Sequence, residues 1–403
     1  MELYGTIRAP REILFGPGQR QAVGAVAAKL GRRALIVTDA RLAADADLRA
    51  MSDALARQGI ESRIESGTPP DVPVDAAIDA AEAGRDFAPD LVVAVGGGSC
   101  LDMGKTVALL LTHGGRPQDY YGENKVPGPI LPVLAIPTTA GTGSEVTPVA
   151  VLSDPDRQLK VGISSLHLVP QAAICDPELT MSCPPGLTAI AGADAMTHAI
   201  EAFTAVRRPL TPTLTQERVF IGKNALSDHF ALNALERLWA GLETACRDGS
   251  NAEARQNVML GAMLAGLAFG VAGTAAAHAI QYPIGALTHT AHGTGVACLM
   301  PYVMEFNRPA IEPELAALGS IFGVGAGDDP VEAVADLFSR IGIPRSLADL
   351  GLGEDRLGWV AEQSCGITRL IENNPRPIDS RAAEALVAAA FSGERAELSR
   401  QEA

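Results

Sequence analysis

Short apolar runs alternate with helix-length segments along the first third of the chain. The runs 34–37 and 91–95 have the length of buried strands, and 48–58 and 75–84 have helical spacing of apolar positions. Another apolar run covers residues 130–136. Strand-length runs separated by helix-length segments are typical of βαβ units on a parallel sheet. The pattern therefore predicts a Rossmann-like α/β domain with a parallel sheet.

The alternation stops at Pro184 and Pro185, and long Ala- and Leu-rich segments follow. These segments lack a strand-like run of comparable strength, so we expect an all-α second domain. The predicted boundaries are 1–184 for the α/β domain and 185–403 for the helical domain, with a functional cleft between them. The segments with helical patterning are 187–204, 228–245, 252–269, 330–342 and 381–390.

An uncharged stretch from Gln256 to Met304 includes a Gly-x-x-x-Gly step, at Gly266 and Gly270, of a kind that also occurs in membrane helices. The stretch contains Asn257, several histidines and Pro283, which favour a helix buried at the centre of a soluble domain.

Composition narrows the class of partner. The chain has 403 residues, 47% of them hydrophobic, and a formal net charge of −15. An acidic surface argues against binding a nucleic-acid backbone or an anionic membrane, so a small molecule is the expected partner. The six cysteines form no Cys-x-x-Cys pair, and the N-terminus lacks the pattern of a signal peptide. We expect free thiols and a cytoplasmic protein.

A glycine-rich turn follows the predicted strand at 91–95. Gly96, Gly97, Gly98 and Ser99 lead into a helical pattern at 101–111. Backbone N–H groups in such a turn and the helix N-terminus can hold a pyrophosphate. The turn is not the Gly-x-Gly-x-x-Gly fingerprint, and a ligand-free turn remains the alternative.

A second polar loop follows the run 130–136 and carries Thr138, Thr139, Thr142 and Ser144. Its hydroxyl and glycine N–H groups suit phosphate or nicotinamide, although the loop can also be a simple turn. Asp39 stands at the end of the run 34–37, where a carboxylate can accept from a ribose 2′-hydroxyl and repel a 2′-phosphate. This position predicts NAD rather than NADP; the alternative is an Asp that closes a turn.

Candidate metal ligands lie in the second half of the chain. Asp194 and His198 are one helical turn apart, and His278 and His292 occur in the uncharged stretch. Together they would make a set of one carboxylate and three imidazoles, which suits Fe²⁺ or Zn²⁺. On spacing alone, interior histidines and a helical Asp–His side-chain pair explain the same residues.

Three motifs, at 192–203, 96–99 and 135–144, resemble the iron-containing (group III) alcohol dehydrogenases, and they fall in the family's order. The resemblance implies the dehydroquinate synthase-like architecture and implies that Asp194, His198, His278 and His292 bind the metal. It also implies that Asp102 and Lys160 contact the cofactor. Asp102 can instead complement a helix N-terminus, and Lys160 can be a solvated charge.

Two departures from the family pattern point to one of its branches. Tyr282 replaces a histidine that many members carry four residues after the third ligand, and the connector 207–227 is long and basic. Both features resemble the hydroxyacid–oxoacid transhydrogenase branch. We place Tyr282 with His278 among the candidate catalytic residues, as a hydrogen-bond donor, while a packing role remains the alternative.

The sequence thus predicts a metal-dependent oxidoreductase that transfers a hydride between NAD(H) and a small alcohol or aldehyde. The first domain would bind the dinucleotide, and the second would bind the metal and the substrate. The alternatives are a hydroxyacid–oxoacid transhydrogenase and a lyase of the dehydroquinate synthase type. We also expect a homodimer.

Overall fold

Among residues 3–157, 159–325 and 327–400, which the computed structural model describes, six strands form one parallel sheet. The sheet belongs to a unit made of residues 8–182 and 213–219. Its strand order is β1-β9-β6-β4-β2-β3, and the predicted parallel sheet is confirmed. The strands are β1 (Glu12–Phe15), β2 (Arg33–Val37), β3 (Glu61–Glu65), β4 (Leu91–Gly96), β6 (Val133–Pro137) and β9 (Ala172–Cys175).

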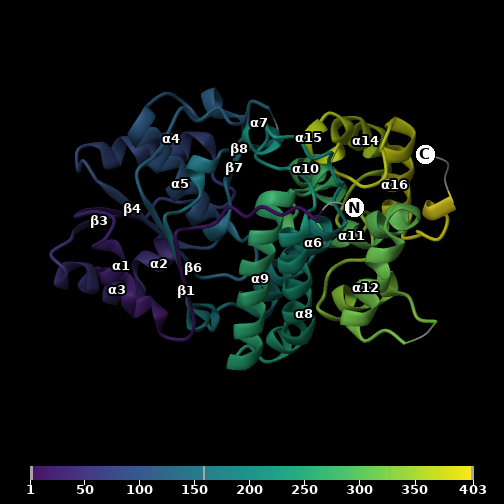
Figure 1. The fold of residues 1–403 in the computed structure, drawn as a ribbon, viewed down its shortest axis with the longest axis horizontal. Helices are drawn as coiled ribbons and strands as arrows, with labels where there is room; N and C mark the ends of the chain where they lie inside the picture. Colours follow the sequence, from purple (N-terminus) through teal and green to yellow (C-terminus); the bar gives the residue numbers. More distant parts are fainter. Residues whose placement is uncertain (1–2, 158, 326, 401–403) are drawn as a thin grey trace. The chain divides into compact units, whose positions relative to one another are not determined.

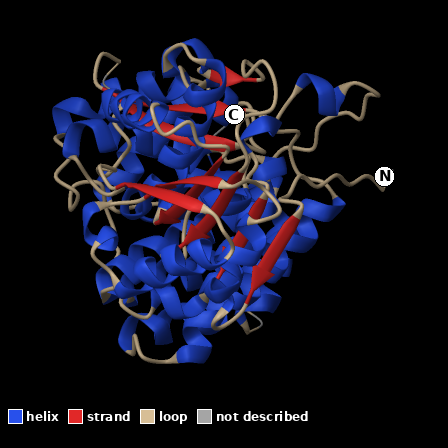
Figure 2. Ribbon diagram, turned by 90° about the vertical axis from the view of Figure 1, so that its left-hand side faces the viewer, coloured by secondary structure: helices blue, strands red, loops and turns tan. Residues whose placement is uncertain are grey.

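Successive side chains of the central strands face opposite layers of helices. In β2, Ala34 and Ile36 pack in one apolar cluster with α1 (Val23–Ala27) and α3 (Ala46–Arg57). Leu35 and Val37 pack in a second cluster on the other face. That cluster includes residues of α4 (Val74–Arg85) and α5 (Gly98–His113). Because both faces of the central strands are covered, β4 and β6 are buried along their whole length, and Figure 2 shows strands with helices around them.

The strand order reverses between β2 and β4. The chain leaves β2 toward β3 at one edge of the sheet and leaves β4 toward β6 in the other direction. The carboxyl ends of β2 and β4 therefore flank a topological switch point, where open α/β sheets bind ligands. Asp39 follows β2 and the triple glycine begins at the last residue of β4, so both predicted cofactor segments lie at this switch point.

A small second sheet in the same unit was not predicted. It pairs β5 (Gly122–Glu123) with β8 (Leu159–Ser164) in parallel and β8 with β7 (Val149–Asp154) antiparallel. Ala150 and Leu152 of β7 are buried and pack with α5, whereas their neighbours are half-buried. The period-2 alternation that identifies such a strand extends over only six residues, which is a weak signal.

The second unit, residues 3–7, 183–212 and 220–400, is helical, and the predicted fold class is confirmed. Its centre is α6, which is buried along most of its length and packs against α8, α9 and α11 (Figure 1). The longer helices are α6 (Pro185–Thr204), α8 (Ala225–Arg247), α9 (Ala252–Ala272), α10 (Ala276–Thr288), α11 (His292–Asn307), α12 (Glu312–Phe322), α13 (Pro330–Arg340), α14 (Leu357–Cys365) and α16 (Ser380–Ser392).

We expected one buried helix in the uncharged stretch 256–304. The structure instead divides this stretch among α9, α10 and α11. Gly273 and the residues after it end α9, and His289, in the left-handed conformation, ends α10. In the described part of the chain, no single helix has the length and apolar character of a membrane span. The α9–α10 pair meets that test only jointly and bends by 102°. Among the described residues, none of the six cysteines forms a disulfide, as predicted.

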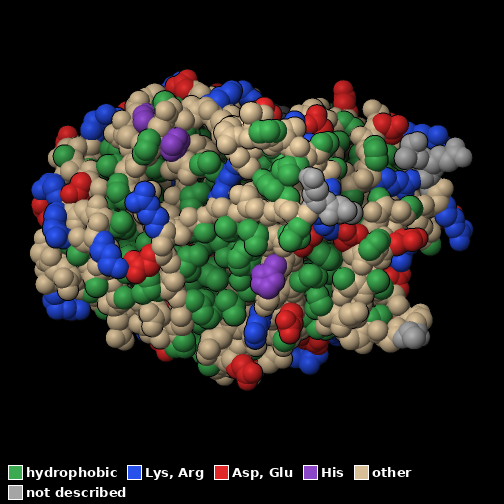
Figure 3. Space-filling model, viewed as in Figure 1, with side chains coloured by type: hydrophobic (Ala, Val, Ile, Leu, Met, Phe, Trp, Pro, Cys, Tyr) green, Lys and Arg blue, Asp and Glu red, His purple; other side chains and the backbone are tan. Residues whose placement is uncertain are grey.

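Figure 3 shows one face of the molecule, where the basic and acidic side chains are intermingled near the edges. Apolar side chains form a broad area over the position of α9 in Figure 1. On this face, no large patch of basic side chains is seen among the described residues, which agrees with the acidic composition.

One buried ion pair joins the segment after β1 to the end of β9. Asp176 is fully buried; it accepts from the backbone N–H groups of Gly18 and Arg20 and pairs with the Arg20 guanidinium at 2.7 Å. Replacing Asp176 by Ala is expected to lower the free energy of unfolding by about 3–5 kcal/mol, because both N–H groups lose their acceptor and the Arg20 guanidinium loses its one fully buried carboxylate partner. Glu178→Gln is the control. That carboxylate contacts the same guanidinium at a half-exposed position, so urea unfolding should show a loss below about 1 kcal/mol. Equal losses in the two variants would contradict this account.

Candidate active site

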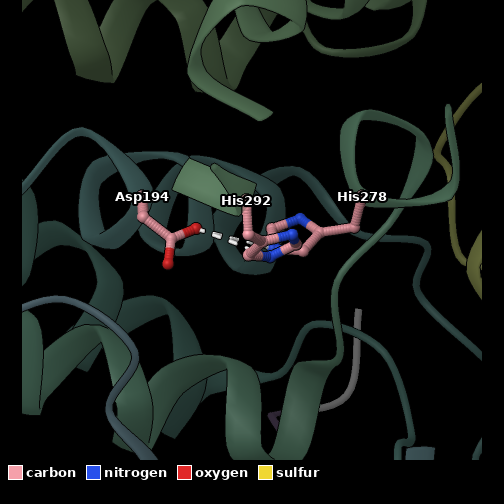
Figure 4. A group of neighbouring side chains, drawn as sticks. All are labelled: Asp194, His278 and His292. Carbon is pink, nitrogen blue, oxygen red and sulfur yellow. Dashed lines mark ion pairs between the residues drawn. The ribbon is translucent and has the colours of Figure 1, made fainter. Parts of the chain in front are cut away.

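Helices α6, α10 and α11 bring a carboxylate and imidazoles together inside the helical unit. Asp194 comes from α6, His278 from α10 and His292 from the first turn of α11. Each offers a ligand atom, and these atoms lie within 4.8 Å of one another. Figure 4 shows the Asp194 carboxylate directed at the two rings.

His198 lies beside this group, one turn after Asp194 on the same helix. Its Nε2 is 3.8 Å from Asp194 Oδ1, and the corresponding distance is 3.9 Å for His278 and for His292. The His198 ring stacks between His278, at 4.7 Å between centroids, and Phe269, at 4.2 Å. The structure thus gathers all the residues that were predicted as metal ligands around one carboxylate oxygen.

Close approach of the helices depends on a glycine. A Cβ atom at Gly293, the second residue of α11, would lie 2.5 Å from the carbonyl oxygen of Ile190 and 3.0 Å from Asp194 Cβ. Any side chain there would push the start of α11, and His292 with it, away from α6. Gly293 therefore allows a ligand from α11 to meet one from α6.

The cluster fits a cation. Asp194 Oδ1 and His278 Nε2 are buried, and neither has a hydrogen-bond partner among the described residues. A buried polar atom without a hydrogen bond lowers the free energy of unfolding by about 1–3 kcal/mol, so two such atoms side by side suggest a missing partner. Tetrahedral ligands at zinc-type bond lengths are roughly 3.4 Å apart, slightly closer than the separations seen here. A divalent ion would satisfy both atoms after a small contraction.

Two residues that contact the Nδ1 atoms of His278 and His292 were not predicted. Glu201 Oε2 lies 2.6 Å from His278 Nδ1, and Gln281 Oε1 lies 2.7 Å from His292 Nδ1. Burial alone would raise the pKa of Glu201, but His278 and two backbone N–H groups lower it below the ordinary value. A sequence signal for Glu201 exists, because it continues the helical spacing of Asp194 and His198 in an apolar helix.

The two predicted cofactor loops pack against each other in the α/β unit. Thr138 N–H donates to Gly96 O at 2.9 Å, and a Cβ atom at Gly98 would lie 2.4 Å from the Thr142 side chain. A Cβ atom at Gly97 would lie 3.3 Å from Thr139 Oγ1. The absence of side chains on the glycines therefore allows the hydroxyl-bearing loop to lie close to the start of α5.

The Asp102 carboxylate accepts hydrogen bonds from the second polar loop and from the strand after it. It accepts from the Ser144 hydroxyl at 2.6 Å and from Val151 N–H at 2.9 Å. One turn later, the fully buried Lys105 donates to Thr147 O at 2.9 Å and to Val149 O at 2.8 Å. Burial raises the pKa of Asp102 and lowers that of Lys105 to about 8. Both side chains clamp the segment that follows the loop onto α5.

The remaining predicted cofactor residues also have partners in the fold. Asp39 Oδ1 accepts from Leu42 N–H at 2.8 Å and caps the short helix α2 (Ala40–Ala43), as in the turn-closing alternative. Lys160 pairs with Asp71 at 2.6 Å. The backbone N–H of Asp71 donates to Ser99 Oγ at 3.3 Å, which links Lys160 to the glycine turn. Sequence reasoning had not singled out Asp71.

The residues that set this chain apart from the family pattern lie in the helical unit and its connector. Tyr282 is half-buried, with its ring centroid 6.0 Å from that of His292. Arg207, at the start of the connector, pairs with Asp228 at 3.0 Å. The connector contains the short helix α7 (Leu214–Glu217). Tyr282 is thus next to the cluster, whereas the Arg207 guanidinium is engaged by an acidic side chain of α8.

A glycine turn at the switch point of a parallel sheet and a carboxylate–imidazole cluster among buried helices together indicate a metal-dependent oxidoreductase. Comparison with known proteins supports this class. The family model "Iron-containing alcohol dehydrogenase" matches residues 10–177, and the model of the family's C-terminal domain matches residues 188–391. The chain belongs to the iron-containing alcohol dehydrogenase family.

Individual relatives cover nearly the whole chain. Long-chain-alcohol dehydrogenase 1 of Geobacillus thermodenitrificans is 34% identical over 370 residues, which are 89% of either chain. NAD-dependent methanol dehydrogenase of Bacillus methanolicus is 31% identical over 88% of this chain and 92% of its own length. The crystal structure of sulfoacetaldehyde reductase from Bifidobacterium kashiwanohense, in complex with NAD⁺, has a TM-score of 0.83 at 28% identity, covering 97% of this chain and 99% of that one.

A pH-dependent term in stability is expected from Glu145, which directly follows Ser144. Burial raises its pKa to about 7, with Lys105 opposing. The folded protein then binds this proton more tightly than the unfolded chain, so the stabilisation is complete below about pH 4 and is lost as the pH rises through 7. Glu145→Gln cannot ionise and should raise the free energy of unfolding at pH 8 by about 1–3 kcal/mol, with a smaller gain at pH 5. Denaturant titrations at both pH values test this, with the exposed Glu82→Gln as the control. A gain that does not depend on pH would contradict the assignment.

Proposed function

We propose that this alcohol oxidoreductase is NAD-linked and that Asp194, His198, His278 and His292 hold its divalent cation. It would oxidise a small alcohol or reduce the corresponding aldehyde. The observation that carries the proposal is that Asp194 Oδ1 has imidazole Nε2 atoms 3.8–3.9 Å away, while this oxygen and His278 Nε2 are both buried and have no hydrogen-bond partner among the described residues. A purely structural cluster would be expected to pair these buried atoms directly.

The residues divide the chemistry between them. When bound, the cation supplies Lewis acidity toward the substrate oxygen, and the nicotinamide gives or takes the hydride. Asp194 provides the negative charge that balances a divalent ion, and the imidazoles provide neutral donors. Glu201 and Gln281 keep the His278 and His292 rings oriented. In the α/β unit, the glycine turn and the adjoining threonines offer N–H and hydroxyl groups to the dinucleotide.

NAD as the cofactor is supported by the names of two relatives, one an NAD-dependent dehydrogenase and one crystallised with NAD⁺. It is also supported by Asp39 at the carboxyl end of β2, where its Oδ1 caps α2 and its Oδ2 lies 3.9 Å from Cys100 Sγ. A fixed carboxylate at the switch point would repel a 2′-phosphate. The donor set suits Fe²⁺ and Zn²⁺ alike, and the family name favours iron.

A hydroxyacid–oxoacid transhydrogenase remains the alternative prediction, because Tyr282 lies beside His292. A steady-state assay separates the two. A dehydrogenase accumulates NADH from free NAD⁺ and one alcohol, whereas a transhydrogenase requires an oxo-acid acceptor. The homodimer also remains a prediction.

Removing a ligand should empty the cation site without unfolding the chain. Both Asp194→Asn and His278→Ala are expected to lose most of the bound metal and at least about 100-fold in kcat, because an under-coordinated ion is held weakly. Metal analysis of anaerobically purified protein and an NADH-based assay measure the two effects. His289→Asn is the matched control, since His289 lies on the turn between α10 and α11 and Asn tolerates its left-handed conformation. Full metal content in either ligand variant would exclude that residue from the site.

Cofactor choice should depend on Asp39. Asp39→Gly is expected to reduce the preference for NAD over NADP by about tenfold or more in kcat/KM, because the repulsion of the 2′-phosphate disappears. Asp45→Gly is the control, since Asp45 caps α3 through Asp47 N–H and matches the lost helix cap. If both variants keep the wild-type NAD/NADP ratio, Asp39 serves only as a helix cap.

A further inference from the structure

A buried carboxylate contacts the Nδ1 atom of His278 and fixes the orientation of its imidazole ring. Glu201 is buried on α6, and its Oε2 lies 2.6 Å from His278 Nδ1. An ionised carboxylate can only accept a hydrogen bond, so Nδ1 carries the proton. The other ring nitrogen, Nε2, then has its lone pair available, and this is the atom that lies 3.9 Å from Asp194 Oδ1.

The same carboxylate holds the start of α10. Its Oε2 accepts from Ala275 N–H at 2.9 Å and its Oε1 accepts from Ala277 N–H at 2.8 Å. Helix α10 has no cap from its own side chains, so Glu201 replaces the N-cap and places a negative charge at the positive end of the helix. With these donors on both oxygens, Glu201 is held in one orientation, and so is the His278 ring.

His292 has an equivalent partner that lacks the charge. Gln281, buried on α10, places Oε1 2.7 Å from His292 Nδ1. Gln281 Nε2 has no hydrogen-bond partner among the described residues. The two histidines therefore differ in the strength of their support: a carboxylate raises the basicity of the imidazole that donates to it more than an amide oxygen does.

We propose that Glu201 is the positioning residue that sets the metal affinity of this centre, and that Gln281 is a weaker, neutral equivalent for His292. The inference rests on the proposed role of the cluster as a cation site. Glu201 would act through His278, by fixing the Nε2 lone pair toward the ion and by strengthening it as a donor. Partners of this kind typically change metal affinity by about 10–100-fold.

The test measures the zinc dissociation constant of the apoprotein by competition with a chromophoric chelator. Glu201→Gln is expected to bind Zn²⁺ about 10–100-fold more weakly than the wild type. Gln281→Glu should bind Zn²⁺ about tenfold more tightly, because it gives His292 Nδ1 a charged acceptor. The substitution removes no hydrogen bond of Gln281 Nε2 among the described residues. The visible absorption bands of the Co²⁺-loaded proteins should shift in both variants, since the donor strength of a ligand changes.

Asn373→Ala is the matched control for a merely structural role. Asn373 Nδ2 donates to Ala272 O and Thr274 O, so it supports the same turn before α10 without contacting a histidine. This variant should lose thermal stability but keep the wild-type zinc affinity within about threefold and the same Co²⁺ bands.

The possible outcomes distinguish a failure of the role inferred for Glu201 from a failure of the proposed cation site. Zinc affinity in Glu201→Gln within threefold of wild type would overturn the inference, as would equal losses in Glu201→Gln and Asn373→Ala. A weakened Gln281→Glu would also overturn it. A wild-type protein that binds no Zn²⁺ or Co²⁺ at all would instead refute the proposed cation site.

Discussion

The packing of α6, α10 and α11 depends on how the buried carboxylate of Asp194 is compensated. Asp194 lies among imidazoles that are too distant to donate to it, and a carboxylate transferred from water into a protein interior costs several kcal/mol unless a positive charge offsets it. Neutral imidazoles bring lone pairs, not charge, so the proposed cation would offset the carboxylate and accept the imidazole lone pairs. The burial of α6, the close approach at Gly293 and the capping of α10 by Glu201 all serve this one geometry.

The α/β unit contains the second part of the proposed site, where backbone N–H groups of the glycine turn would meet an anionic dinucleotide. The glycines have no side chains that would collide with the neighbouring threonines, and the hydrogen bonds of Asp102 and Lys105 hold the adjoining loop and the segment after it against α5. Asp102 and Lys105 are thereby satisfied inside the fold, and the proposed ligand would be held by the backbone of the turn.

This division also explains how relatives named for different substrates share the architecture. The elements that position the ligands are buried helices and strands, whereas Tyr282 and the connector after Arg207 lie outside the ligand set. Under the proposed function, substitutions at such positions would alter which alcohol is accepted without changing the proposed cation and dinucleotide sites. The engagement of Arg207 by Asp228 shows how a basic residue that looks available in the sequence is already paired in the fold.

Periodicity and motif chemistry determined the fold class, the strands β2 and β4, the long helices and the candidate ligands, because each of these depends on residues close together in the sequence. Asp194 and His198 are one turn apart, and the triple glycine adjoins its own strand. The hairpin β7–β8 was missed because its alternation is short. Glu201, Gln281 and Asp71 emerged only from the tertiary structure, since their partners lie on other elements. A carboxylate in an apolar helix signals that it needs a donor, but only the packing of α10 against α6 decides that the donor is His278.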